Sequence, residues 1–131
     1  MTGLDSNVLV RYFFKDDPLQ TPIAVTLIHS LSPADPGWVG LVVLAELIWV
    51  LKRIYKVGRT GIIDVVEILL ASQEIVLEQE DLVGRAFSLY RNGKADFGDC
   101  LISISARNAG CDRIATFEKR SARDAGMELI G

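Results

Sequence analysis

The chain has 131 residues, of which 50% are hydrophobic and 24% charged, and its formal net charge is −3. This length suits a single domain, and the apolar content can form a core that offsets the entropy of ordering, which excludes disordered and fibrous proteins. The two cysteines, Cys100 and Cys111, belong to no Cys-x-x-Cys or Cys/His cluster, so we expect reduced thiols in a cytoplasmic protein and no structural zinc.

Short strands that alternate with helices are predicted along the whole chain. In chain order we expect a strand over residues 1–5, helices over 8–14 and 18–31, a strand over 38–40, helices over 44–51 and 62–71, a strand over 74–77, helices over 81–90 and 99–109, and strands over 113–117 and 127–130. Residues 99–109 alternate in part like a strand, but Gly110 is typical of a helix end and favours a helix. The pattern predicts an α/β fold with a mostly parallel central sheet, in one domain over residues 1–131.

Targeting and membrane segments are not expected. The first apolar run is bounded by Asp5 and Arg11, which makes it too short for a signal peptide. The longest charge-poor stretch, residues 37–51, is shorter than the roughly 20 residues of a membrane span and contains Glu46. The mean hydropathy of +0.29 is high for a lone monomer, so we expect self-association or a protein partner.

The sequence lacks the motifs of several common kinds of catalytic and nucleotide-binding site. The single histidine, His29, has no serine or cysteine motif around it, so a Ser/His or Cys/His catalytic pair is not expected. The glycines form neither the GxGxxG nor the GxxxxGK[S/T] pattern, which excludes the common nucleotide-phosphate cradles.

Carboxylates remain as the candidate functional groups. Asp5 and Glu118 each follow an apolar strand candidate, Glu46 is the only charge within residues 38–51, and Asp96 and Asp99 share one helix face. Ligands of open parallel sheets bind at the carboxyl ends of the strands. Acids that meet there repel each other unless cations bind among them, and oxygen ligands suit Mg²⁺. The set therefore favours metal-assisted hydrolysis of a phosphodiester bond by a metal-activated water.

These acids also have purely structural interpretations. Asp5, Asp96 or Asp99 can cap a helix, and Glu118 can be a surface turn residue. Between Glu46 and Asp64 the sequence has no acid but four basic residues, Lys52, Arg53, Lys56 and Arg59. This basic group can be a phosphate-binding surface or simply a solvated face.

Four segments together resemble the motifs of the PIN-domain ribonucleases, and among them the VapC-like toxins of toxin–antitoxin pairs. These segments are residues 3–12 with the following Lys15-Asp16-Asp17-Pro18, then 44–47, 95–102 and 115–118. The resemblance implies a three-layer α/β/α sandwich and a Mg²⁺- or Mn²⁺-dependent endoribonuclease that cuts RNA. It also implies a homodimer, inhibition by a cognate antitoxin, and a helix over residues 99–109.

The same resemblance suggests roles for individual residues. Asp5, Glu46 and Asp99 match the acids that bind metal. Glu118 completes the catalytic set where the family more often has aspartate, and its extra methylene favours contact with the metal through water. Accessory positions next to the acids match Ser6, Asp96 and Thr116.

Two alternatives stay open at this stage. A catalytically silent PIN-like scaffold that binds RNA or protein has the unusual Glu118 in its favour. A phosphatase of the haloacid-dehalogenase type is disfavoured, because it needs a second aspartate at the position of Asn7.

Overall fold

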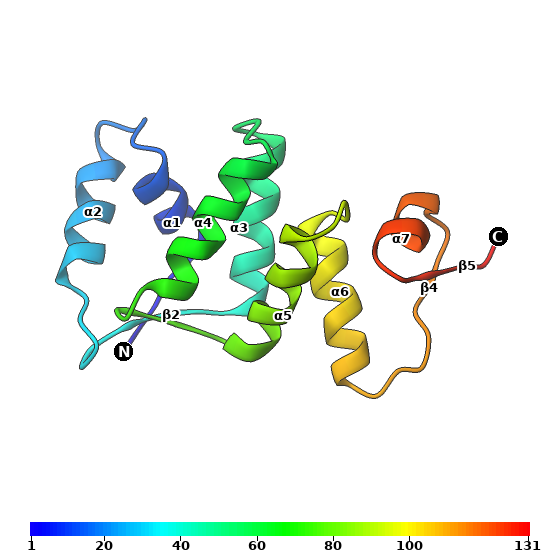
Figure 1. Ribbon diagram of the computed structural model, residues 1–131. Helices are drawn as coiled ribbons and strands as arrows, with labels where there is room; N and C mark the ends of the chain where they lie inside the picture. Colours follow the sequence, from blue (N-terminus) through cyan, green and yellow to red (C-terminus); the bar gives the residue numbers. More distant parts are fainter. The chain divides into compact units, whose positions relative to one another are not determined.

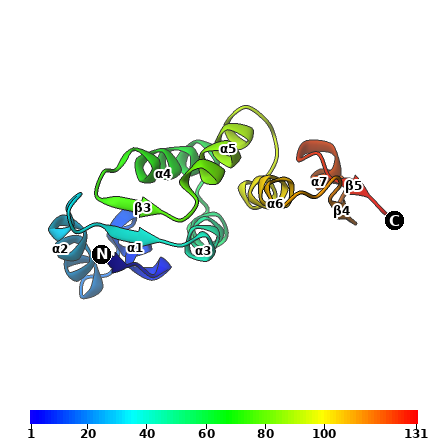
Figure 2. The ribbon, with the colours of Figure 1, turned by 90° about the horizontal axis from the view of Figure 1, so that it is seen from below.

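The computed structural model describes residues 1–131, which divide into two units, residues 1–78 and residues 79–131. The first unit contains a parallel three-stranded sheet in the order β1 (Thr2–Gly3), β2 (Gly37–Val39) and β3 (Ile75–Leu77). Gly37 of the central strand pairs with Thr2 on one side and with Ile75 on the other. β2 and β3 run side by side in the same direction (Figure 2).

The helices of this unit lie above β2 in the view of Figure 1. They are α1 (Ser6–Phe13), α2 (Gln20–Ser30), α3 (Leu41–Arg53) and α4 (Arg59–Ala71). α1 packs against both α2 and α3, and α3 packs against α4. Burial of apolar side chains from one face of each helix builds the core, in which Leu9, Leu47 and Val66 are at most 1% exposed.

The second unit combines two packed helices with a small parallel ribbon. Its elements are α5 (Glu80–Arg91), α6 (Phe97–Asn108), β4 (Ala115–Thr116), α7 (Lys119–Asp124) and β5 (Glu128–Leu129). α5 and α6 pack along each other, and the Tyr90 and Phe97 rings meet edge to face with centroids 5.4 Å apart. Cys100 on α6 is buried, whereas Cys111 is exposed, and neither forms a disulfide. None of the helices in the structure combines the length and apolar character that crossing a membrane requires.

The predicted α/β class with a parallel sheet is confirmed, and each predicted helix and strand has a counterpart. The strand over residues 1–5 is shorter than expected, because Asp5 already caps α1. The helical interpretation of residues 99–109 is confirmed by α6. Only α7 was not predicted, since its six residues, Lys-Arg-Ser-Ala-Arg-Asp, carry no apolar periodicity.

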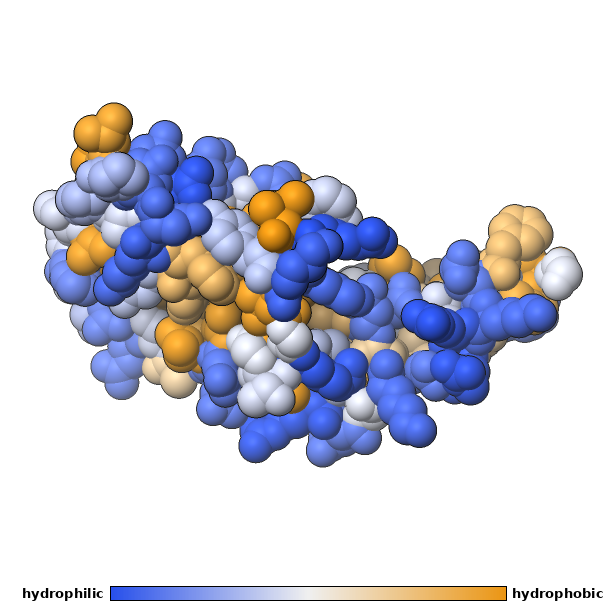
Figure 3. Space-filling model, turned by 90° about the horizontal axis from the view of Figure 1, so that it is seen from above, coloured by the Kyte–Doolittle hydropathy of each residue, from blue (hydrophilic) through white to orange (hydrophobic).

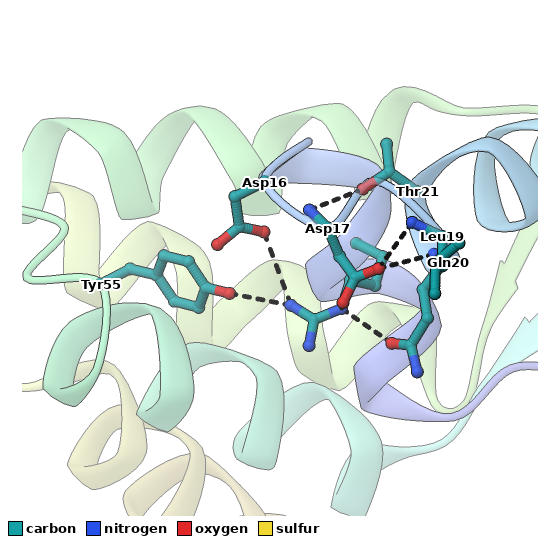
Figure 4. Close-up of polar contacts among 7 residues, drawn as sticks. Asp16, Asp17, Leu19, Gln20, Thr21 and Tyr55 are labelled. Atoms are coloured by element: carbon teal, nitrogen blue, oxygen red, sulfur yellow. Dashed lines mark hydrogen bonds and ion pairs between the residues drawn. The ribbon is translucent and has the colours of Figure 1, made fainter.

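Arg11 connects the end of α1 to two other parts of the first unit (Figure 4). Its Nε donates to Oε1 of Gln20 at 2.9 Å, and its Nη1 donates to the hydroxyl of Tyr55 at 3.0 Å. The Tyr55 ring also lies against Phe14, with centroids 4.4 Å apart. These contacts tie α1 to the start of α2 and to the segment that follows α3.

Asp17 organises the start of α2. Its Oδ1 accepts the backbone N–H groups of Leu19 at 2.9 Å and Gln20 at 2.7 Å, and its Oδ2 lies 4.0 Å from Nε of Arg11 (Figure 4). The carboxylate thus satisfies N–H groups that a helix start leaves without partners. The Asp-Asp-Pro part of the first motif therefore has a structural role in this chain.

The charge of Asp17 makes this contribution dependent on pH. Hydrogen bonds from the backbone of Gln20 and then of Leu19 hold the pKa of Asp17 below its ordinary value. Such a carboxylate stabilises the folded state above its unfolded pKa of about 3.9 and loses the effect as the pH falls through the folded pKa. We expect Asp17→Ala to melt a few degrees below the wild type near neutral pH, and the difference to narrow as the pH falls below about 3.9.

Thermal melts followed by circular dichroism over this pH range measure the effect. Asp17→Asn is the matched control, because it keeps the oxygen acceptor without the charge and should melt between the other two proteins near neutral pH. A melting difference between Asp17→Ala and wild type that stays constant from neutral to acid pH would contradict an ionic contribution.

Candidate functional site

Two candidate acids of the first unit meet at one serine hydroxyl. Asp5 directly follows β1 and is the N-cap of α1, where its Oδ1 accepts the backbone N–H of Ser6 at 2.7 Å. The Ser6 hydroxyl donates to Oε1 of Glu46, which lies in the second turn of α3, and is 3.5 Å from Oδ1 of Asp5. Ser6 is only 5% exposed, whereas both acids are exposed. The structure thus brings together Asp5, Ser6 and Glu46.

The capping and metal-binding interpretations of Asp5 are compatible. The cap uses Oδ1, so Oδ2 takes no part in it. Glu46 likewise accepts the serine hydroxyl through Oε1 alone. Each carboxylate keeps one oxygen outside these hydrogen bonds, and carboxylate oxygens are the ligands that Mg²⁺ and Mn²⁺ prefer.

The second unit holds the other candidate acids. Asp99 lies in the first turn of α6 and is half-buried, and its Oδ2 accepts the hydroxyl of Ser121 at 2.8 Å. Asp96 is the N-cap residue of the same helix. Glu118 follows β4, is exposed and occupies the N-cap position of α7; its backbone N–H donates to Oγ1 of Thr116 at 3.0 Å. Within each unit taken alone, no three His, Cys, Asp or Glu side chains form a group that could hold a metal ion.

The comparison with family models decides which kind of domain carries these acids. The model of the PIN domain matches residues 4–126, which include the acids of all four motifs. The chain belongs to the PIN-domain family.

Individual relatives of this PIN-domain chain include a VapC ribonuclease. The VapC ribonuclease of Aquifex aeolicus (strain VF5) is 32% identical over 120 residues, which cover 92% of this chain and 89% of that protein. Among solved structures, VapC20 of Mycobacterium tuberculosis, described as a toxin that cleaves the sarcin-ricin loop, is 18% identical, with a TM-score of 0.48 over 99% of this chain and 98% of that one.

Glu78 is a site-supporting residue that sequence reasoning missed. It follows β3 directly, and its Oε1 accepts the backbone N–H of Leu41 at 2.8 Å, at the start of α3. The N-cap residue of that helix is Gly40, which has no side chain to offer, so Glu78 supplies the missing acceptor. Because α3 carries Glu46, this contact fixes the helix that presents a candidate metal ligand. An acid directly after an apolar strand was the available signal, and it is the signal that identified Asp5.

The predicted basic group lies at the end of α3 and the start of α4. Lys52, Arg53 and Lys56 are exposed and Arg59 is half-buried. Lys56 adopts a left-handed backbone conformation with φ of 56°, which turns the chain sharply between the two helices. Ile54, which follows Arg53 in the chain, is exposed with 63% of its surface. Hydrophobic groups also lie among hydrophilic ones on the face of the molecule seen in Figure 3.

Proposed function

We propose that this PIN-domain protein is a Mg²⁺- or Mn²⁺-dependent endoribonuclease and the toxin of a VapBC-type toxin–antitoxin pair. The observation that carries the proposal is the meeting of Asp5, the N-cap residue of α1, and Glu46 of α3 at the hydroxyl of the buried Ser6. Two exposed acids held this close are electrostatically unfavourable unless a cation binds between them. The relative named VapC ribonuclease supports RNA as the substrate.

Each candidate residue has a defined role in this proposal. Asp5, Glu46 and Asp99 bind the metal directly, and Glu118 contacts it through water. A divalent ion at these oxygens supplies an activated water molecule and stabilises negative charge on the phosphate. Ser6 orients Glu46, and Thr116 holds the turn that presents Glu118. Asp96, the N-cap residue of the helix that carries Asp99, assists as an accessory acid.

The basic group at the end of α3 is the proposed contact for the RNA backbone. Lys52 and Arg53 lie about two turns beyond Glu46 on α3, a rise of roughly 10 Å. Lys56 and Arg59 extend the positive charge into the following loop and α4. Lysine and arginine side chains bind phosphate groups without regard to sequence, so this surface contributes affinity while leaving the choice of RNA to other contacts.

The proposal extends to location and partners. We infer a cytoplasmic protein that folds as one domain over residues 1–131, forms a homodimer and is inhibited by a cognate antitoxin. Exposed apolar side chains at the start of α2 support a protein partner, since Leu19 and Ile23 are 80% and 71% exposed.

Cleavage of a labelled RNA by the purified protein tests the activity. We expect cleavage in Mg²⁺ or Mn²⁺, none in EDTA, and recovery when the metal is restored in excess. RNA that is bound but remains intact in every metal would favour the silent scaffold, for which the exposed Glu118 at the start of α7 is the supporting observation.

A further inference from the structure

Buried polar side chains are rare in this chain and concentrate at the candidate acids. The buried polar or charged residues are three serines, Ser6, Ser103 and Ser121. Burial of a hydroxyl is costly unless it forms a hydrogen bond. Ser6 donates to Glu46 and Ser121 donates to Asp99, so two of the three buried serines contact an acid proposed to bind metal.

Further hydrogen bonds fix the segments that carry Ser121 and Asp99. The Ser121 side chain is 6% exposed, and its Oγ lies 2.8 Å from Oδ2 of Asp99. The Ser121 carbonyl accepts the N–H of Ala125 at 3.0 Å, which fixes the residue within α7. A second contact joins the same two parts of the chain, because Nη2 of Arg107 on α6 donates to the carbonyl of Gly126 at 3.2 Å. Hydrogen bonds near the start of α6, at Asp99, and near its end, at Arg107, therefore attach this helix to the segment that contains α7.

We propose that Ser121 is a positioning residue for Asp99 and limits it to binding a metal through one oxygen. The inference rests on the proposed function. A serine hydroxyl has a single proton, which here is directed to Oδ2. With Oδ2 engaged, the carboxylate cannot rotate freely, and Oδ1, which accepts no hydrogen bond within residues 79–131, is the oxygen available to Mg²⁺ or Mn²⁺. Partners that orient a ligand in this way commonly affect metal affinity strongly.

Titration of the purified protein with Mn²⁺ by calorimetry tests the role of Ser121 without any RNA. We expect Ser121→Ala to weaken Mn²⁺ binding by about tenfold or more, with a matching rise in the Mn²⁺ concentration needed for half-maximal RNA cleavage. Ser121→Thr keeps the hydroxyl and should restore affinity to near the wild-type value. Ser103→Ala is the matched control, because Ser103 is equally buried on α6 and donates to no carboxylate, so it should change Mn²⁺ affinity by less than about twofold.

The possible outcomes separate this inference from the proposed function. If Ser121→Ala binds Mn²⁺ like the wild type while Asp99→Asn does not bind it, the positioning role is wrong and the nuclease proposal stands. An equal loss in Ser103→Ala would mean that packing alone matters, which also overturns it. A wild-type protein that binds no Mn²⁺ overturns both. Should Ser121→Ala not fold, Ser121→Cys fills the same space with a much weaker donor and carries the same expectation.

Discussion

Asp5→Asn, Glu46→Gln and Asp99→Asn should each lower the rate of RNA cleavage by about a hundredfold or more, because each removes one charged ligand from the proposed metal site. The fold should survive all three changes. Asparagine caps helices as well as aspartate, so α1 keeps its N-cap, and glutamine at position 46 still offers an oxygen to the Ser6 hydroxyl. The same holds for asparagine at position 99 opposite Ser121.

Cleavage assays with circular dichroism of each variant measure activity and folding separately. Asp64→Asn is a suitable control, since Asp64 is an exposed acid on α4 outside the four motifs, and it should keep wild-type activity. A folded Asp5→Asn protein that cleaves RNA at the wild-type rate would remove Asp5 from the site. The same logic applies to Glu46 and Asp99 individually, so the three results together define the ligand set.

Divalent metal should also stabilise the folded protein, and Asp5→Asn should lose most of that effect. For a Kd of about 1 mM and roughly 10 mM Mg²⁺, binding to the folded state alone adds about 1.4 kcal/mol, or a few degrees in Tm. In EDTA, Asp5→Asn should melt above the wild type, since the repulsion between Asp5 and Glu46 is removed while the cap is retained.

Thermal melts of both proteins in EDTA and in Mg²⁺, at matched ionic strength, make this comparison. Matched ionic strength is essential, because salt alone screens repulsion between exposed acids. Equal Mg²⁺ shifts in wild type and Asp5→Asn would mean that the ion binds elsewhere, and the meeting of Asp5 and Glu46 would then have no role in metal binding.

Much of the local structure could be predicted from the sequence because it depends on near neighbours. Apolar residues at helical spacing identify α3 through Leu44, Leu47 and Leu51, and all three are buried as that spacing predicts. The capping role of Asp5 follows from its place between an apolar start and a helix. The first two candidate acids were also found this way, since a charge within an apolar stretch is visible without a structure.

Contacts between distant residues were not predictable by the same means. Ser121 and Asp99 are 22 positions apart, and nothing in the short polar sequence of α7 marks one serine as buried. The cap that Glu78 provides for α3 spans 37 positions. Such pairs depend on how strands and helices pack, which periodicity does not specify. The proposed roles of Asp99 as a metal ligand and of Glu118 as a water-mediated contact therefore rest on the motif resemblance and on the tests above.

The two ends of α1 together restrict how this helix can change in length. α1 has eight residues, fewer than an isolated helix needs to be stable in water, so its order depends on its anchors. Asp5 and Ser6 anchor one end against Glu46, and Arg11 anchors the other against Gln20 and Tyr55. One inserted residue would rotate one end against the other by about 100°, because an α-helix has 3.6 residues per turn. The segment can therefore accept substitutions on its outer face, but an insertion or deletion would separate Asp5 from Glu46 or Arg11 from Tyr55.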